Sequence, residues 1–360
     1  MYILIVQPVL TSYRKVFFDA LSSSFQLVEV YADLNPGEGF KLGVEGLFKK
    51  KHTPVIGNRK KIYYQVGIIK AVLKNKPSAI FITADFRAVH FWLILILANV
   101  LKVPIFSHGQ GLYNKPNFGN LHKLMFKTVT KLSSQYVCYT DSVHKSLIDI
   151  GVMPSKLSVM DNTIVNKYAV KPSDKPATKH RLLYLGRLRE GNNLELLFDA
   201  MKLLKERGKE IALDIVGDGT ERTRLEEDVR SSSIDVTFLG AVYDDQAISE
   251  ISKKSTIGVY PGDAGLSIVH YMSLSLVPIV HDDLTMHMGP EPSYIESGFN
   301  GLTFKRGDSL SLAQAIEYAL DTKSFRDLSE HAFETYCSLS KPTMSNKLIQ
   351  IMSPYVDTVK

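Results

Sequence analysis

The chain has 360 residues, enough for about two domains that each bury a core. Hydrophobic residues make up 45% and charged residues 22%, an ordinary globular composition that excludes a disordered or fibrous chain. The net charge of +6 is unevenly distributed. Residues 1–180 carry 24 Lys and Arg against 10 Asp and Glu, a net of +14, whereas residues 181–360 carry 19 against 27, a net of −8. This asymmetry indicates two domains with different partners.

The chain starts without the features of a secretory signal. Residues 1–6 lead directly into Gln7 and Pro8, with no basic region and no small-residue cleavage site. The longest apolar run, residues 91–100, is too short to span a bilayer. Two cysteines, Cys138 and Cys337, provide neither a disulfide framework nor a metal cluster. We therefore expect a cytoplasmic protein.

Apolar strand-like runs alternate with helical patterns along the first half. Strands are predicted at residues 2–6, 26–31, 79–83, 103–107, 136–139 and 157–160, and helices at residues 14–21, 66–73, 88–101 and 120–132. Near-continuous apolar strands between helices are typical of a parallel sheet covered on both faces.

A charged stretch with two prolines, residues 167–180, predicts a linker. Beyond it, strands are predicted at residues 181–185, 211–216, 236–239, 256–260, 277–280 and 301–304, with helices at 194–205, 222–229, 247–252 and 267–274 and from 310 onward. The predicted fold class is α/β, with two doubly wound, parallel-sheet domains of Rossmann type facing a cleft. We assign residues 1–166 and 181–340 to the domains, and residues 341–360 to a C-terminal helix expected to pack back on the first domain.

Three loops at the carboxyl ends of strands in the second half are candidates for ligand binding, because ligands of such folds bind there. Gly186 and Arg187 follow the first strand and place a permanent cation beside a helix N-terminus, which suits a phosphate. A solvated Arg187, with Asn192 or Asn193 capping the helix, explains the pattern equally well.

The other two loops are rich in glycine. Gly217 and Gly219 either aim N–H groups at an anion or form a tight turn, and the turn is the simpler interpretation. The third loop contains Gly262, Gly265 and Leu266, and His270 follows one helical turn later. A lone histidine on a helix is usually structural, but its position after this loop makes a functional role equally plausible.

Together these loops carry a family resemblance. The ordered patterns are Gly-Arg-Leu at 186–188, Val-Gly-Asp-Gly at 216–219, Phe-Leu-Gly at 238–240, Pro-Gly-x-x-Gly-Leu at 261–266 and Pro-Ile at 278–279. Residues 181–305 thereby resemble the C-terminal domain of the retaining glycosyltransferases of family 4 (group 1), of the bacterial surface-polysaccharide type. This resemblance implies the GT-B fold.

The resemblance also implies roles for single residues. Arg187 would neutralise the departing diphosphate of a nucleotide-sugar donor, helped by the amides around Gly217, Gly219, Gly265 and Leu266. His270 would hold the ribose or a phosphate, and Gly186, Asn192 and Gly262 complete the implied donor site. The sequence departs from the family where Asn192 replaces a lysine and where Gly262 and His270 replace two glutamates. It instead resembles a branch with a later Met-x-x-Glu stretch near residues 287–291.

His108 follows a predicted strand of the first half, in Ser-His-Gly. The resemblance places it near the donor sugar, as a catalytic-site residue, and an equally good interpretation is a histidine that caps the strand end. No Asp-x-Asp motif occurs in the sequence, so we expect no bound metal and no cofactor beyond the nucleotide-sugar substrate. Cationic side chains and helix N-termini would then stabilise the leaving group.

Basic residues of the first half cluster at residues 49–51 and 59–61 and at Lys123, Lys127 and Lys131. They suit an anionic membrane surface, with a solvated face as the simpler alternative, and no nucleic-acid-binding motif accompanies them. Phe91, Trp92 and Leu93 would add apolar contacts with lipid if exposed, or else belong to the core.

The sequence therefore predicts a metal-independent, retaining glycosyltransferase. It would transfer a sugar from a nucleotide-diphosphate donor to a lipid-linked surface glycan such as lipopolysaccharide or capsule, at the inner face of the cell membrane. A nucleotide-sugar epimerase of the same fold and a non-catalytic glycosyltransferase-like subunit remain the alternatives.

Overall fold

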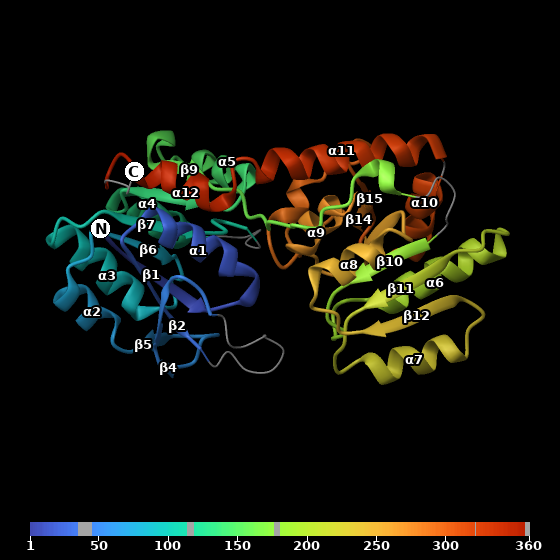
Figure 1. The fold of residues 1–360 in the computed structure, drawn as a ribbon, viewed down its shortest axis with the longest axis horizontal. Coiled ribbons are helices and arrows are strands. Elements are labelled where there is room, and N and C mark those ends of the chain that lie inside the picture. Colours follow the sequence, from blue (N-terminus) through green and yellow to red (C-terminus); the bar gives the residue numbers. More distant parts are fainter. Residues whose placement is uncertain (35–44, 114–118, 176–180, 321, 357–360) are drawn as a thin grey trace. The chain divides into compact units, whose positions relative to one another are not determined.

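The computed structural model describes residues 1–34, 45–113, 119–175, 181–320 and 322–356, which form two compact units (Figure 1). Unit 1 consists of Met1–Asn162 and Pro342–Lys360, and unit 2 of Thr163–Lys341. The chain thus leaves unit 1, builds unit 2 and returns to unit 1 for its last segment.

Unit 1 is built on a seven-stranded parallel sheet in the order β3-β2-β1-β6-β7-β8-β9. Its strands are β1 (Tyr2–Val9), β2 (Leu27–Asp33), β3 (Lys49–His52), β6 (Ala79–Thr83), β7 (Ile105–Gly109), β8 (Gln135–Cys138) and β9 (Leu157–Val159). A separate antiparallel pair is formed by β4 (Val55–Gly57) and β5 (Tyr63–Gln65). The inner strands are buried on both faces, as in sheets covered by crossover helices.

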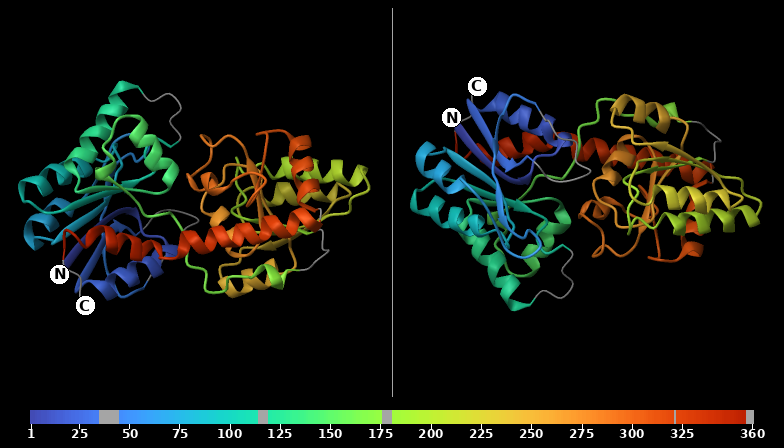
Figure 2. Two further views of the ribbon diagram at one scale, coloured as in Figure 1. Left: turned by 90° about the horizontal axis from the view of Figure 1, so that it is seen from above. Right: turned by 90° about the horizontal axis from the view of Figure 1, so that it is seen from below.

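Helices cover both faces of this sheet (Figure 2). One core contains side chains of α2 (Ile68–Asn75), α3 (Val89–Val100), α4 (Asn120–Leu132) and α5 (Asp141–Asp149). The other contains side chains of α1 (Lys15–Ser24) and α12 (Met344–Met352), the element that returns from unit 2. An ion pair of 2.7 Å between Lys347 Nζ and Asp161 Oδ2, both largely buried, fixes α12 to the segment after β9.

Unit 2 contains a six-stranded parallel sheet in the order β12-β11-β10-β13-β14-β15. Its strands are β10 (Arg181–Leu185), β11 (Ala212–Val216), β12 (Asp235–Gly240), β13 (Ile257–Tyr260), β14 (Val277–His281) and β15 (Leu302–Phe304). Its helices are α6 (Leu194–Glu206), α7 (Arg222–Arg230), α8 (Asp245–Ser252), α9 (Ser267–Ser273), α10 (Ser309–Leu320) and α11 (Thr322–Ser340). Short 3-10 turns lie at Ser12–Arg14, Pro154–Lys156, Pro172–Asp174 and Glu291–Tyr294. The order β11-β10-β13 marks a doubly wound sheet, and the predicted fold class of two Rossmann-like units is confirmed.

The structure adds elements that the sequence pattern missed, namely β3, β4, β5 and α5. The lysines at 49–51 belong to β3, an edge strand whose residues are all exposed, and lysines are common on edge strands because they discourage further pairing. The predicted linker is only partly free of structure: Val170 is buried in the core of unit 2, and its N–H donates to the Ser273 carbonyl. Residues 176–180 of that linker lie outside the described residues. The predicted C-terminal helix is shorter than expected and spans only Met344–Met352.

Within the described ranges, no helix combines the length and the apolar character needed to cross a bilayer.

Candidate functional site

The candidate site of unit 2 lies where the strands β10, β11 and β13 end. These three strands are neighbours in a parallel sheet, so the loops that follow them meet at one edge. The loops are residues 186–193, 217–221 and 261–266, and they contain every residue that the sequence analysis assigned to the donor site except His270, which lies on α9.

Glycines allow the first two loops to touch backbone to backbone. A Cβ on Gly217 would lie 1.8 Å from the Gly186 carbonyl oxygen, and one on Gly219 would lie 2.1 Å from the Leu188 carbonyl oxygen. The Leu188 N–H donates to the Asp218 carbonyl at 3.0 Å, which joins the loops directly. The N–H of Gly217 donates to Gly240, and that of Gly219 to the Asp218 carboxylate. The structure thus explains both glycines by close packing, and their contact with a donor stays a prediction.

The third loop packs against the first in the same way. A Cβ on Gly262 would lie 2.2 Å from the Gly191 carbonyl oxygen. Asn192, 3% exposed, donates its side-chain amide to the Tyr184 hydroxyl at 2.8 Å and to the Arg187 carbonyl. Asn192 therefore supports the backbone of the first loop from inside, a role that the sequence did not reveal.

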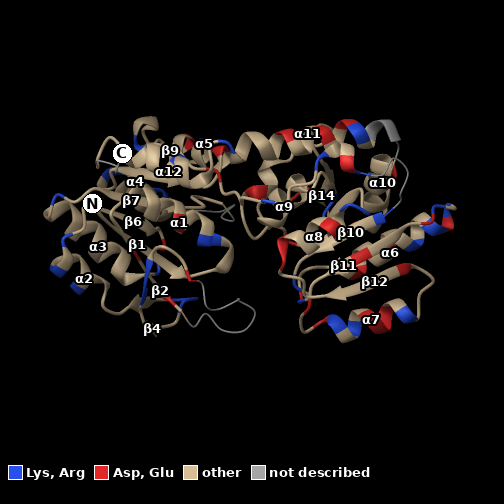
Figure 3. Cartoon of the chain, in the orientation of Figure 1, with Lys and Arg blue, Asp and Glu red and all other residues tan. Residues whose placement is uncertain are grey.

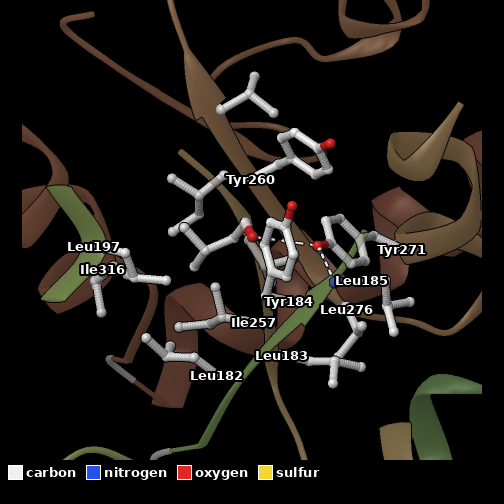
Figure 4. Packing of buried hydrophobic residues seen from close by; sticks show 14 of the residues in the cluster. Leu182, Leu183, Tyr184, Leu185, Leu197, Ile257, Tyr260, Tyr271, Leu276 and Ile316 are labelled. Atoms are coloured by element: carbon white, nitrogen blue, oxygen red, sulfur yellow. Dashed lines mark hydrogen bonds between the residues drawn. The ribbon is translucent and has the colours of Figure 1, made fainter. Parts of the chain in front are cut away.

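Two buried tyrosines, Tyr184 and Tyr271, lie among the core side chains near the end of β10, where the first loop begins (Figure 4). The Tyr184 hydroxyl donates to the Arg187 carbonyl at 3.0 Å, and burial raises the pKa of this phenol well above its usual value. The same hydroxyl would lie 2.7 Å from a Cβ on Gly186, so the loop passes directly over the ring. The Tyr271 hydroxyl accepts the Leu185 N–H at 2.9 Å and donates to the Val259 carbonyl at 3.2 Å, which ties β10 to β13 near their ends.

The first loop, residues 186–193, carries two arginine side chains. The side chains of Arg187 and Arg189 are exposed, and that of Arg189 contacts the Met288 sulfur. Of the two, only Arg187 was predicted from the sequence. The second arginine was visible two residues further on, but only the contact with Met288 places it beside the third loop.

His270, the predicted ribose or phosphate ligand, is half-buried on α9. Burial lowers the pKa of its imidazole to about 4, against an opposing effect of the Asp245 carboxylate. Among the described residues its ring has no hydrogen-bond partner. The group is therefore neutral at physiological pH and adds no positive charge to the site.

A pair of stacked histidines holds the third loop. The His281 and His287 rings lie 3.7 Å apart and nearly parallel, and both are fully buried. His287 Nδ1 accepts the Ala264 N–H at 3.0 Å while its Nε2 donates to the His281 carbonyl at 3.0 Å. The Met288 N–H donates to the Ala264 carbonyl, so both backbone groups of Ala264 are bound by one short segment. This contact fixes the path of the loop directly before Gly265 and Leu266, both half-buried at the start of α9.

Charged groups surround this histidine pair. His281 Nε2 donates to Asp263 Oδ1 at 3.2 Å, and Arg306 lies 3.4 Å from the same oxygen. Burial is the main cause that lowers the pKa of both imidazoles, to about 4 for His287. The Glu291 carboxylate is buried nearby, and its Oε2 lies 3.7 Å from where a Cβ on Gly265 would stand. The sequence pointed to residues 287–291 but not to His281, although it ends a strand.

His108 of unit 1 is an interior residue in this structure. It is 3% exposed, its ring stacks on Phe81 at 4.2 Å, and its Nε2 lies 2.8 Å from Gln7 Nε2 and 3.1 Å from Thr83 Oγ1. Burial, with a smaller effect of Arg14, lowers its pKa to about 3. The structure thus places His108 inside unit 1, and a role at the donor sugar stays a prediction.

Each unit also contains an open cavity. In unit 1 a cavity of about 630 Å³ lies where β6 and β7 end, and its lining includes Asp85, Arg87, Tyr113, His122, Phe126 and Tyr139. In unit 2 a cavity of about 750 Å³ lies at the opposite edge of the sheet from the candidate site, and its lining includes Arg181, Lys205, Lys209 and Lys254. In the part of the chain that the structure describes, no group of three or more His, Cys, Asp and Glu side chains converges as a metal site would require.

Two doubly wound, parallel-sheet units in one chain are the architecture of the GT-B class of fold. Residues 167–335 match the sequence model of the family described as glycosyl transferases group 1, a little under half of the chain. No curated protein matches the chain in sequence.

Solved structures share the fold over the whole chain. A glycosyltransferase from Rickettsia africae is 15% identical, with a TM-score of 0.71 and coverage of 99% of this chain and 98% of its own. Anabaena HepE in complex with UDP-glucose is 15% identical, with a TM-score of 0.65 and coverage of 98% and 99%. The lipopolysaccharide outer core galactosyltransferase WaaB is 14% identical, with a TM-score of 0.68 and coverage of 98% and 100%. The chain therefore has the GT-B fold.

Proposed function

We propose that the protein is a glycosyltransferase that moves a sugar from a nucleotide-diphosphate donor to a surface-glycan acceptor carried on a lipid. The observation that carries this proposal is the set of loops after β10, β11 and β13, which lies wholly within the residues that match the glycosyltransferase family. The complexes of similar structures with UDP and with UDP-glucose support a nucleotide-sugar donor.

The chemistry requires positive charge at the leaving group. During transfer the bond between the anomeric carbon and the diphosphate oxygen breaks, and the electron pair leaves with the diphosphate. We assign Arg187 to that charge, since a fixed guanidinium aimed at developing negative charge lowers the barrier of such a step. Arg189 on the same loop is a second cation for the same diphosphate.

The acceptor hydroxyl forms the new bond to the same anomeric carbon, and we propose that configuration is retained. Its proton passes to the departing phosphate oxygen, as the family resemblance implies. No protein carboxylate is then needed as a base, consistent with Gly262 and His270 at the two family glutamate positions. We further propose that arginines and loop amides supply the stabilisation without a metal ion.

The contacts that hold the three loops in place also support their assignment as the donor site. Asn192 and Tyr184 both hold the Arg187 carbonyl, and glycines interlock the three loops. Such support keeps a binding group in place before the substrate arrives, which reduces the reorganisation needed in the reaction. We assign contacts with the nucleotide ribose or a phosphate to the neutral His270.

We place the reaction in polysaccharide biosynthesis, of lipopolysaccharide or capsule, at the cytoplasmic face of the cell membrane. The similarity to WaaB supports a glycan of the cell surface. The excess of cations in residues 1–180 supports a negatively charged surface as the place of action.

The test is to incubate the whole protein with a panel of nucleotide-diphosphate sugars, with and without lipid-linked glycan acceptors. Transfer or slow donor hydrolysis supports the proposal. An isomerised donor would instead show an epimerase, and the absence of any donor conversion with every acceptor would show a non-catalytic subunit.

A further inference from the structure

Helix α3 of unit 1 is apolar on both its buried and its exposed face. Its twelve residues include no Lys, Arg, Asp or Glu, and in Figure 3 it carries neither charge colour. Phe91, Ile94, Leu95 and Ala98 are fully buried against the sheet. A helix that is apolar all round is normally enclosed in a core or a membrane, yet α3 has an outward face.

The outward face of α3 is a regular stripe. Val89, Leu93, Ile96 and Val100 are exposed, Leu93 to 46% and Val100 to 73%. Their spacing of four, three and four residues places them along one side of a helix. Of the three aromatic and aliphatic residues that the sequence singled out, Phe91 is core, Trp92 is half-buried and Leu93 belongs to this stripe.

The helices α2 and α4 pack beside α3 and continue the apolar surface. All three contribute to the same core, and Asn99 Nδ2 donates to the Leu132 carbonyl at 2.9 Å, which joins the ends of α3 and α4. Leu73 on α2 and Leu121 and Leu124 on α4 are exposed, the last two above 60%. Single exposed leucines are ordinary, but seven large aliphatic side chains on three adjacent helices mark an interaction surface.

The charges on these helices have one sign. They carry the five lysines Lys70, Lys74, Lys123, Lys127 and Lys131 and no acidic residue. Lys70, Lys74, Lys127 and Lys131 are exposed. We call the outward side of α2, α3 and α4 the apolar-lysine face.

We propose that the apolar-lysine face docks on an anionic lipid bilayer. Apolar side chains can enter the headgroup region of such a bilayer, and the lysines that flank them attract its negatively charged lipids. A second copy of the chain fits less well, because a twofold contact would oppose lysines with lysines. A nucleic acid would leave the aliphatic stripe in water, since its backbone offers phosphates and no apolar partner.

This inference rests on the proposed function in one respect only. The proposed function explains why the protein would dock, namely to bring the enzyme to a lipid-linked acceptor. Binding to vesicles is measured without donor or acceptor. A failure to bind lipid and a failure to transfer sugar are therefore seen in separate experiments.

The experiment is co-sedimentation of the whole protein with phosphatidylglycerol–phosphatidylcholine vesicles and with phosphatidylcholine vesicles. We expect the protein to bind the anionic vesicles, with an affinity that declines as salt is added. Its affinity for the neutral vesicles should be at least tenfold lower. The double variant Leu93→Ser with Ile96→Ser should lose at least tenfold in affinity, and Lys70→Gln with Lys74→Gln and Lys131→Gln a similar amount.

The matched control is Leu310→Ser on α10 of unit 2. Leu310 is also 46% exposed, but it does not lie on a surface whose only charged residues are lysines. It should bind vesicles like the parent protein. Because all the changed side chains are exposed, thermal melting should show that the variants stay folded. The proposal is overturned if the parent protein stays in the supernatant or if the Leu93 and Ile96 variant binds as well as the parent. It is equally overturned if gel filtration shows a dimer that this variant abolishes, or if an acidic protein but no anionic vesicle binds the face.

Discussion

Helices α3 and α7 both lie on the outside of a doubly wound sheet, but they expose opposite chemistry. In α7, Arg222 pairs with Asp218 and Glu226, and Arg224 pairs with Glu195, Glu221 and Asp228. Helix α3 has no charge at all, and its neighbours α2 and α4 have only lysines. A helix surface that carries paired charges of both signs is typical of exposure to water. The contrast agrees with the two proposals made above, that unit 1 docks on a lipid bilayer at this face and that unit 2 binds a soluble donor.

The site of unit 2 departs from the charge of its surroundings. Residues 181–360 have a net charge of −8, yet the expected ligand is a diphosphate. The arginines of the first loop supply positive charge locally, on a backbone that Tyr184 and Asn192 hold. Net charge thus separates the two units, whereas the proposed anion-binding residues come from the loop motifs and not from net charge.

The largest effect that separates the units is expected from Arg187→Ala. Turnover of the donor should fall by about 100- to 1000-fold, the loss typical when one preorganised donor to a developing negative charge is removed. Binding to anionic vesicles should not change, because the apolar-lysine face lies wholly in unit 1. Steady-state kinetics and co-sedimentation of the same preparation check both parts, and near-normal turnover would contradict the role of Arg187.

A smaller but structural effect is expected from Gly217→Ala. The new Cβ would collide with the Gly186 carbonyl, so we expect the free energy of unfolding to fall by about 1–3 kcal/mol. Chemical denaturation measures this change. Gly119→Ala in unit 1 is the control, because a Cβ there meets no described residue within 4 Å and should cost below about 1 kcal/mol. Equal losses at both positions would show that the loops of unit 2 are not interlocked.

Removing one histidine of the stacked pair should raise the KM for the donor about tenfold. His287→Leu removes the acceptor for the Ala264 N–H, and a lost buried hydrogen bond of about 1.4 kcal/mol corresponds to a tenfold change, which should appear in the donor KM rather than in kcat. His287→Asn offers an acceptor oxygen and should recover most of the loss.

The control for that prediction is in unit 1. His90 is buried like His287 and its Nδ1 also accepts a backbone N–H, that of Gln65 at 3.2 Å. His90→Asn should leave the donor KM unchanged. A matching rise in KM for His90→Asn would show that the effect of His287 is general destabilisation.

Acid should destabilise both units, because each contains buried neutral histidines. Burial lowers the pKa of His108 to about 3 and that of His90, His270 and His287 to about 4, whereas the unfolded chain takes up these protons near pH 6.5. Unfolding therefore binds protons, and stability is lost as pH falls from about 6.5 to about 4, by up to about 1.4 kcal/mol per histidine and pH unit. His90 and His108 belong to unit 1, whereas His270, His287 and His281, whose pKa is also lowered, belong to unit 2. Melting of the whole protein between pH 7.5 and 5, followed with probes in each unit, should show both units becoming less stable as the pH falls, and a melting temperature independent of pH would contradict the buried neutral imidazoles.

The sequence predicts what local patterns control. Strand Arg181–Leu185 and helix Asn120–Leu132 were located to the residue, because apolar periodicity dictates both. Edge strand β3 was missed, since its exposed lysines have no apolar period. The glycines of the loops could be found by their spacing, but the reason for them could not. That reason is contact with backbone some 30 to 70 residues away.

Side-chain partners in the site also depend on distant parts of the chain. Asn192 was predicted to belong to the donor site, which stays a prediction, and the partners that the structure shows for it, Tyr184 and the Arg187 carbonyl, depend on how the loop folds over β10. His287 holds Ala264 from a segment 23 residues later. Likewise, the exposed face of α3 could not be told from its buried face by sequence, because both are apolar.

A crystal structure of the whole chain with a bound nucleoside diphosphate tests the central claim most directly. The account predicts that the diphosphate lies at the carboxyl edge of the unit 2 sheet, in contact with the Arg187 guanidinium and with His270 within reach of the ribose or a phosphate. A diphosphate bound instead at the opposite edge of that sheet, in the cavity lined by Arg181, Lys205 and Lys209, would contradict it.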